Sequence, residues 1–115
     1  MASYAAVPHL VDIAVKANGP IDFSFFHLPA FIEIARVRGR GPELENPLKA
    51  PYLAALSRLH EAAFLHWAEP WNKDMTISVL AALAAAKGQI DVAEAVGNFD
   101  DDLIGLINSG RWMEC

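Results

Sequence analysis

The stretch VPHLVDIA at residues 7–14 recurs 21 positions later as LPAFIEIA at residues 28–35, with the same residue type at seven of eight positions. Each copy places a proline at the start of an apolar segment, followed by an acidic residue and an Ile-Ala pair. Proline is tolerated in the first turn of a helix, because its missing N–H would have no partner there. Repeated helical units are typical of stacked helical folds. The alternative is chance similarity between two amphipathic helices that both start with proline.

The rest of the chain also favours helices. It contains 20 alanines, and alanine costs the least of all residues in a helix. Apolar residues at three- and four-residue steps support an all-α domain. We expect five or six helices: the first begins after Ser3, a possible N-cap, and reaches Ala17, and the others cover Leu28–Arg38, Pro47 or Pro51 to Ala68, Asp74–Lys87, Asp91–Val96 and Asp101–Asn108. The fourth of these is apolar nearly all round, so we expect it to be the most buried, with Leu80 and Leu83 in the core.

Length and composition limit the class of protein. A chain of 115 residues with 54 % hydrophobic residues is expected to form one folded domain over residues 1–115. The uncharged run at residues 75–86 is shorter than the roughly 20 residues that a membrane span requires. No basic residue precedes Lys16, so no signal peptide is expected, and the single Cys115 excludes an intrachain disulfide framework. We therefore expect a cytoplasmic protein.

The charge of the chain is acidic and unevenly distributed. The net charge is −5; residues 1–58 contribute about +1 and residues 59–115 contribute −6. General nucleic-acid binders carry a basic surplus that meets the phosphate charge. This balance argues against a nucleic-acid partner.

Two segments resemble a known class of helical repeats. Residues 5–14, AAVPHLVDIA, resemble the proline-started inner helix of armadillo and HEAT-type repeats, and residues 80–88, LAALAAAKG, resemble a helix of small bacterial HEAT-like proteins. The resemblance covers about half of the chain and implies a short stack of five to six helices that binds another protein on one face. The spacing of 21 is shorter than a full repeat, and residues 89–115 match no unit, so a compact orthogonal helical bundle is the alternative.

The histidines do not form a metal-binding pattern. His60-Glu61 begins like the zinc signature H-E-x-x-H, but Phe64 stands where the second histidine is required. Because Leu56, His60 and Phe64 follow at four-residue steps, we expect His60 to border the core. His9 and Asp12 lie three residues apart and lead to Lys16, which indicates a solvated helix face. We expect no metal and no cofactor, and the sequence contains no nucleophile elbow or phosphate-binding loop.

Arg36, Arg38 and Arg40 form the basic cluster of the chain, with Lys49 nearby in sequence. Cations are favourable at the carboxyl end of a helix, which is the simpler interpretation of the cluster. A contact with an acidic partner or a phosphate is the alternative. The run Asp100-Asp101-Asp102 similarly indicates a helix amino terminus.

Large aromatic side chains lie in segments that we expect to be links. Phe23, Phe25 and Phe26 precede the second helix, while Trp67 and Trp71 flank Pro70. Such side chains must be buried, either against the chain's own core or against a partner.

These observations favour a non-enzymatic protein-interaction module. We expect a homodimer, because no obvious cap covers the outer face of the first helix, although residues 89–115 are an alternative cap. The alternative function is a small helical enzyme or ligand-binding bundle with a pocket lined by His60, Glu61, His66 and Trp67. The candidate binding residues are Arg36, Arg38, Arg40, His60, Trp67 and Trp71.

Overall fold

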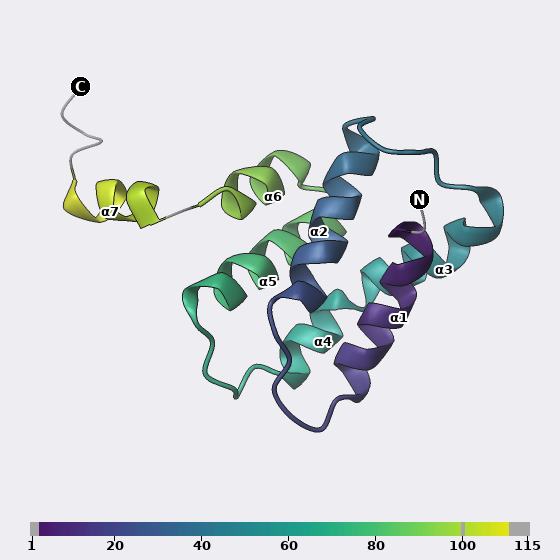
Figure 1. Ribbon diagram of the computed structural model, residues 1–115, viewed down its shortest axis with the longest axis horizontal. Coiled ribbons are helices and arrows are strands. Elements are labelled where there is room, and N and C mark those ends of the chain that lie inside the picture. Colours follow the sequence, from purple (N-terminus) through teal and green to yellow (C-terminus); the bar gives the residue numbers. More distant parts are fainter. Residues whose placement is uncertain (1–2, 100, 111–115) are drawn as a thin grey trace.

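The computed structural model describes residues 3–99 and 101–110 of the chain, and these residues form helices and no strand, which confirms the expected all-α class (Figure 1). The helices pack against one another except for the last one, which is set apart (Figure 1). The helices are α1 (Ser3–Lys16), α2 (Ser24–Val37), α3 (Asn46–Ser57), α4 (Leu59–Leu65), α5 (Lys73–Ala86), α6 (Ile90–Gly97) and α7 (Asp101–Ser109).

The sequence echo corresponds to two helices of equal length. Both α1 and α2 have 14 residues and begin at a serine, Ser3 and Ser24, 21 positions apart. The prediction that the second helix begins at Leu28 is wrong, because the Asp22 carboxylate accepts a hydrogen bond from the Ser24 backbone N–H at 2.9 Å and the helix begins there. Pro8 and Pro29 consequently lie in the second turn of each helix, and not in the first turn as expected.

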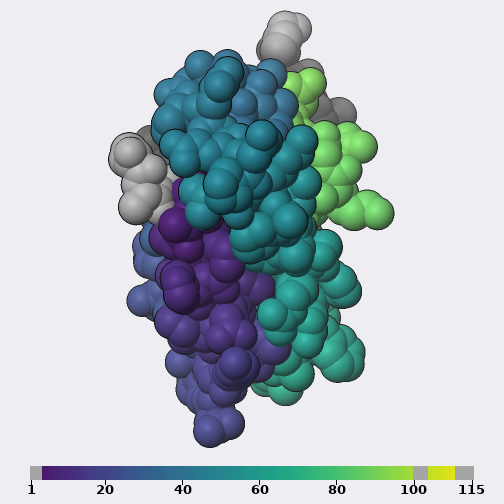
Figure 2. Space-filling model, turned by 90° about the vertical axis from the view of Figure 1, so that its right-hand side faces the viewer, coloured from purple at the N-terminus to yellow at the C-terminus, as the bar shows by residue number. Residues whose placement is uncertain are grey.

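The two echoed helices nevertheless bury different faces. In α1 the buried residues are Tyr4, Val7, Val11 and Ala14. In α2 they are Phe26, Pro29, Ala30, Glu33 and Ile34, which correspond to other positions of the echo. The reason is that α1 packs mainly on α3, as the adjacent purple and teal surfaces in Figure 2 show, whereas α2 packs mainly on α5.

The expected third helix is interrupted. The prediction of one helix reaching Ala68 is wrong, because the chain breaks at Arg58, whose backbone (φ −98°, ψ 0°) belongs to neither α3 nor α4. The Arg58 N–H bonds to the carbonyl of Ala55 at 3.0 Å, which tightens the last turn of α3. The second part of the interrupted helix is α4, which ends at Leu65 and not at Ala68.

The fourth expected helix, α5, is close to its predicted bounds and has more buried residues than any other helix in the described part of the chain. The Asn72 side chain caps α5 by accepting a hydrogen bond from the Met75 N–H at 2.8 Å, and Gly88 follows the helix with φ 81°. The expectation is wrong for Leu80, which is exposed, whereas Leu83 is half-buried and packs against the main core. The buried positions of α5 are Met75, Ser78, Val79, Ala81, Ala82 and Ala85.

One main core joins α1 to α5, and a smaller cluster at Ile34, Ala85, Ile90 and Ala93 joins α2, α5 and α6. Phe25 and Phe26, which were expected in a link, belong to α2, and Phe26 is fully buried in the main core. The cap expected at Asp100 and the terminal Cys115 lie outside the described residues.

Among the described residues, no helix has the length and the apolar character needed to span a bilayer.

Substitution of the buried leucine at the α4 start should destabilise the protein far more than substitution of the exposed one on α5. Leu59 is 1 % exposed, so Leu59→Ala should cost about 2–5 kcal/mol by removing core contacts and leaving a cavity. Leu80 is 52 % exposed, and Leu80→Ala should change stability by roughly 0.5 kcal/mol or less. Chemical denaturation of both variants measures the difference; similar losses would contradict this placement of the core.

Candidate functional site

The basic cluster at the end of α2 is paired within the molecule. Arg38 binds Asp91 at 2.6 Å and Glu94 at 3.1 Å, and Arg40 binds Glu94 at 2.9 Å. Both acidic partners lie on α6, so these two arginines join the end of α2 to α6. This arrangement differs from a simple helix-terminus effect, because each guanidinium has a partner from a distant part of the sequence.

The ion pairs of this cluster shift the pKa of the acid, Glu94, and the pKa of one of the bases, Arg38. The hydrogen bond from Arg40, followed by the nearby charges of Arg40 and Arg38, lowers the pKa of Glu94 below its usual value of 4.5. The hydrogen bond to Asp91 raises the pKa of Arg38. Glu94 and Arg38 are therefore both charged at neutral pH, and their ion pair joins the end of α2 to α6.

The first arginine of the cluster belongs to a different, buried network. The Arg36 guanidinium donates two hydrogen bonds to Glu33, at 2.7 and 2.8 Å, and the Tyr52 hydroxyl donates a third to the same carboxylate at 2.8 Å. The guanidinium carbon also lies 6.0 Å from the centre of the Tyr52 ring. Burial, together with the bond to Glu33, raises the pKa of Tyr52, so its hydroxyl stays protonated and remains a donor.

This network extends to α1 and to the loop that follows α2. The Tyr52 ring makes an edge contact with the Tyr4 ring at a centroid distance of 5.2 Å, and the Tyr4 hydroxyl donates to the Pro42 carbonyl at 2.6 Å. An open pocket of about 330 Å³ lies beside Arg36 and also includes Asn46 and Lys49 from α3. Sequence reasoning missed Glu33 and Tyr52 as functional partners, although an acid three residues before Arg36 within an apolar helix was a readable signal.

The histidines have roles that differ from those expected. His60 is exposed and lies at the edge of a cleft that Leu56 also lines, so the core does not cover it as expected. His66 is the buried one. Its Nε2 lies 2.7 Å from the Ala14 carbonyl oxygen and its Nδ1 lies 2.5 Å from Glu69, so it connects the end of α1 to the segment after α4.

The solvated face expected for α1 is confirmed by an ion pair between Lys16 and Asp12 at 3.1 Å and by the exposure of His9.

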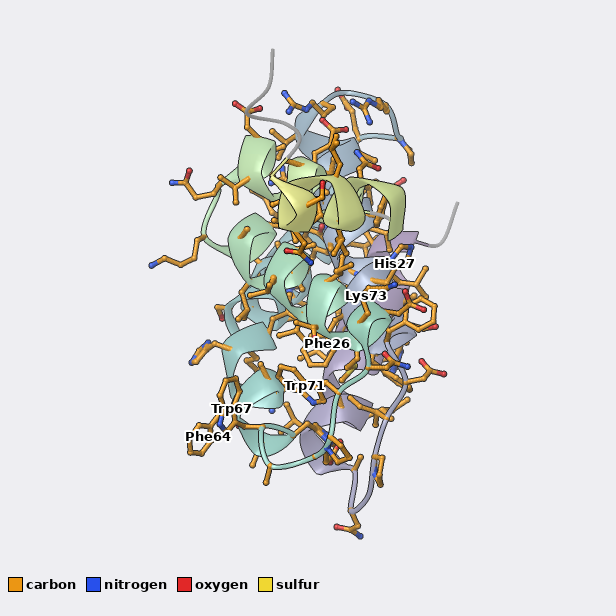
Figure 3. The ribbon with its side chains drawn as sticks, turned by 90° about the vertical axis from the view of Figure 1, so that its left-hand side faces the viewer. Phe26, His27, Phe64, Trp67, Trp71 and Lys73 are labelled. Atoms are coloured by element: carbon orange, nitrogen blue, oxygen red, sulfur yellow. The ribbon has the colours of Figure 1, made fainter. Side chains whose placement is uncertain are left out.

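The two tryptophans after α4 lie in different environments. Trp71 is half-buried against the main core, and its indole N–H donates to the His66 carbonyl at 3.1 Å. Trp67 is 73 % exposed and contacts the Trp71 ring edge-on at 5.4 Å. Phe64, three residues before Trp67, is 79 % exposed. Figure 3 shows Phe64 and Trp67 side by side and pointing away from the ribbon, with Trp71 further in.

We call Phe64, Leu65 and Trp67, supported by Trp71, the aromatic corner. Leu65 is exposed as well, so the corner presents three large apolar side chains within four residues. A short helix followed by Pro70 places these side chains at the end of α4, where neighbouring helices do not cover them. Apolar rings at such a position are typical of the centre of a protein interface.

The four side chains suggested for an enzyme pocket do not converge. His60 lines a cleft of about 480 Å³ with Leu56, Ser57, Leu83, Ala86 and Lys87, whereas Glu61 pairs with Arg58 on the surface. His66 is buried against Ala14, and Trp67 belongs to the aromatic corner. Within residues 3–99 and 101–110, no group of three or more His, Cys, Asp or Glu side chains is arranged to hold a metal ion.

Removal of the Arg36 guanidinium should destabilise the fold by leaving the Glu33 carboxylate buried without its cation. We expect Arg36→Ala to lower the free energy of unfolding by an amount near the lower end of about 3–5 kcal/mol, because the arginine side chain is itself 31 % exposed. The control is the same substitution in a Glu33→Gln background, where no buried charge is left and the further loss should be much smaller. Equal losses in both backgrounds, measured by denaturant titration, would contradict the role given to the pair.

The α2–α6 ion pairs should make stability depend on pH through Glu94. Its folded-state pKa lies below the usual 4.5, so its contribution is fully present above that value and is lost as the pH falls through the folded-state pKa. The stability difference between the wild type and Glu94→Gln should therefore be constant above about pH 5 and should shrink in more acidic solution. Thermal melts of both proteins between about pH 3 and 7 measure this difference; a difference that grows on acidification would contradict it.

The chain gives no significant match to any protein-family model, curated protein or solved structure.

Proposed function

We propose that the chain is a non-enzymatic protein-interaction module that forms a homodimer through the aromatic corner. The observation that carries the proposal is the exposure of Phe64 and Trp67 on one turn at the end of α4. Isolated apolar residues on a surface are ordinary, but adjacent large rings are not. Tryptophan and other aromatic residues are also the side chains that contribute most to interface affinity.

The size of the corner suits the centre of an interface. A buried aromatic side chain covers about 150–250 Å², so the two rings alone expose on the order of 300 Å². Functional patches on monomers have about this size or somewhat more. A standard interface buries about 800 Å² on each partner, with a polar rim around an apolar centre. The corner therefore supplies the centre, and the neighbouring polar residues supply the rim.

Charge favours a second copy as the partner at this surface. Two chains of net charge −5 repel each other over most of their surfaces, and the three corner residues carry no charge. The adjacent ion pair of Arg58 and Glu61, at 3.3 Å, presents both signs of charge beside the corner. A two-fold interface places the same patch on both sides and so must be self-complementary, and a neutral patch bordered by both signs meets that requirement.

The resemblance of residues 5–14 and 80–88 to HEAT and armadillo helices supports the same class of function, since such stacks bind other proteins. The alternative of an enzyme or ligand-binding bundle has no comparable support, because His60, His66 and Trp67 lie apart in the described structure.

Replacement of the corner tryptophan should dissociate the dimer without unfolding the chain. We expect Trp67→Ser to weaken self-association roughly tenfold or more, because central interface aromatics typically contribute about 2 kcal/mol or more. The melting temperature at low protein concentration should barely change, because the side chain makes few core contacts.

Light scattering during size exclusion measures the mass, and Val92→Ser on α6 is the matched control, since Val92 is a similarly exposed apolar residue away from the corner. A wild-type mass near 12.5 kDa at micromolar concentration would refute the homodimer. A dimer that tolerates Trp67→Ser as well as it tolerates Val92→Ser would refute the corner as its interface.

A further inference from the structure

A cleft lies beside the break between α3 and α4, where these two helices meet the end of α5. The end of α3, the start of α4 and the end of α5 enclose about 480 Å³, a volume in the range of ligand-binding pockets. Its apolar lining comes from Leu56, Leu83 and Ala86. Lys87 and His60 stand at its polar edge, and Lys87 has no ion-pair partner among the described residues.

The last helix, α7, carries acidic residues, whereas the cleft carries the basic Lys87. Figure 1 shows α7 extending away from the other helices. Its sequence, DDLIGLINS, combines acidic residues in the first turn with apolar residues at three- and four-residue spacings, which is the pattern of an amphipathic helix. Leu106 is 42 % exposed and Ile107 is 40 % exposed, so these apolar side chains are incompletely covered.

We propose that the cleft receives the apolar face of α7 from a second copy of this chain, an arrangement that rests on the homodimer proposed above. An amphipathic helix that lays its apolar residues into a groove is a common mode of protein recognition. The charges are complementary, since the segment at residues 100–102 consists of three aspartates and the cleft presents Lys87. The contact is reciprocal, because each copy offers one α7 and one cleft.

Zero-length cross-linking of the full-length protein tests the pairing directly. A carbodiimide joins a lysine amine to a carboxylate only when the two are in contact, and a mixture of ¹⁴N- and ¹⁵N-labelled chains distinguishes links between copies from links within one copy. We expect mixed-isotope peptides that join Lys87 to the aspartates at residues 100–102. A link found only within single chains would overturn the proposal, because it would place α7 in its own cleft.

Two variants separate this contact from the aromatic corner. Leu106→Ser should weaken dimerisation at least tenfold and leave the thermal melt of the body unchanged. Lys87→Glu should weaken dimerisation, because it replaces attraction to the aspartates with repulsion, while the control Lys49→Glu, which makes the same change of charge on α3, should leave dimerisation unchanged. A dimer that shows no mixed-isotope link and is insensitive to Leu106→Ser would overturn this inference and leave the homodimer standing. A monomer at all concentrations would overturn both.

Discussion

A carboxylate removed from water costs several kcal/mol unless a cation and hydrogen-bond donors compensate it. Glu33 is such a group, buried in the middle of α2. The bidentate bond from Arg36 supplies the charge, and the Tyr52 hydroxyl supplies the remaining donor from α3. Since Tyr52 packs on Tyr4 of α1, the position of one carboxylate fixes three helices relative to one another. A different placement of α3 would remove the Tyr52 donor and leave the buried Glu33 with only Arg36 of its own helix.

The helices themselves were largely predictable because their signals are local. Asn18, Gly19 and Pro20 stop α1, and Gly88 follows α5, for reasons that belong to the backbone of a few residues. The break at Arg58 was not predictable from periodicity, because the apolar steps continue across it. The start of α2 was misplaced because the hydrogen bond that the Asp22 carboxylate accepts from the Ser24 N–H outweighs the preference of proline for a first turn.

The sequence indicated Trp67 and Trp71 as candidate binding residues, but it did not indicate Phe64 or Leu65. Trp67 lies outside the core, while its neighbour Trp71 packs against the core and donates to the His66 carbonyl. Sequence alone does not distinguish them, because each lies beside Pro70 and each is a tryptophan. Similarly, His60 and His66 differ by less than two turns, and only the latter faces the carbonyl of Ala14 from a distant helix.

The similarity between the sequences of α1 and α2 likewise does not predict which of their residues are buried. Two helices with matching residue types bury different faces, because α3 lies against one and α5 against the other. The acid of the first copy, Asp12, pairs with Lys16 at the surface, whereas the acid of the second copy is buried. Similar sequence thus leads to two opposite environments.

The shortness of α4 links the aromatic corner to local unfolding. A helix of seven residues does not hold its shape alone in water. It persists because Leu59, Ala62 and Ala63 pack into the main core and because His66 anchors the residues that follow. Any local opening that releases these contacts also disperses the corner, although the remaining helices stay folded. In the proposed homodimer, a copy bound at the corner would favour the closed state of α4, and the exposure of its backbone amides to solvent would fall as the protein concentration rises.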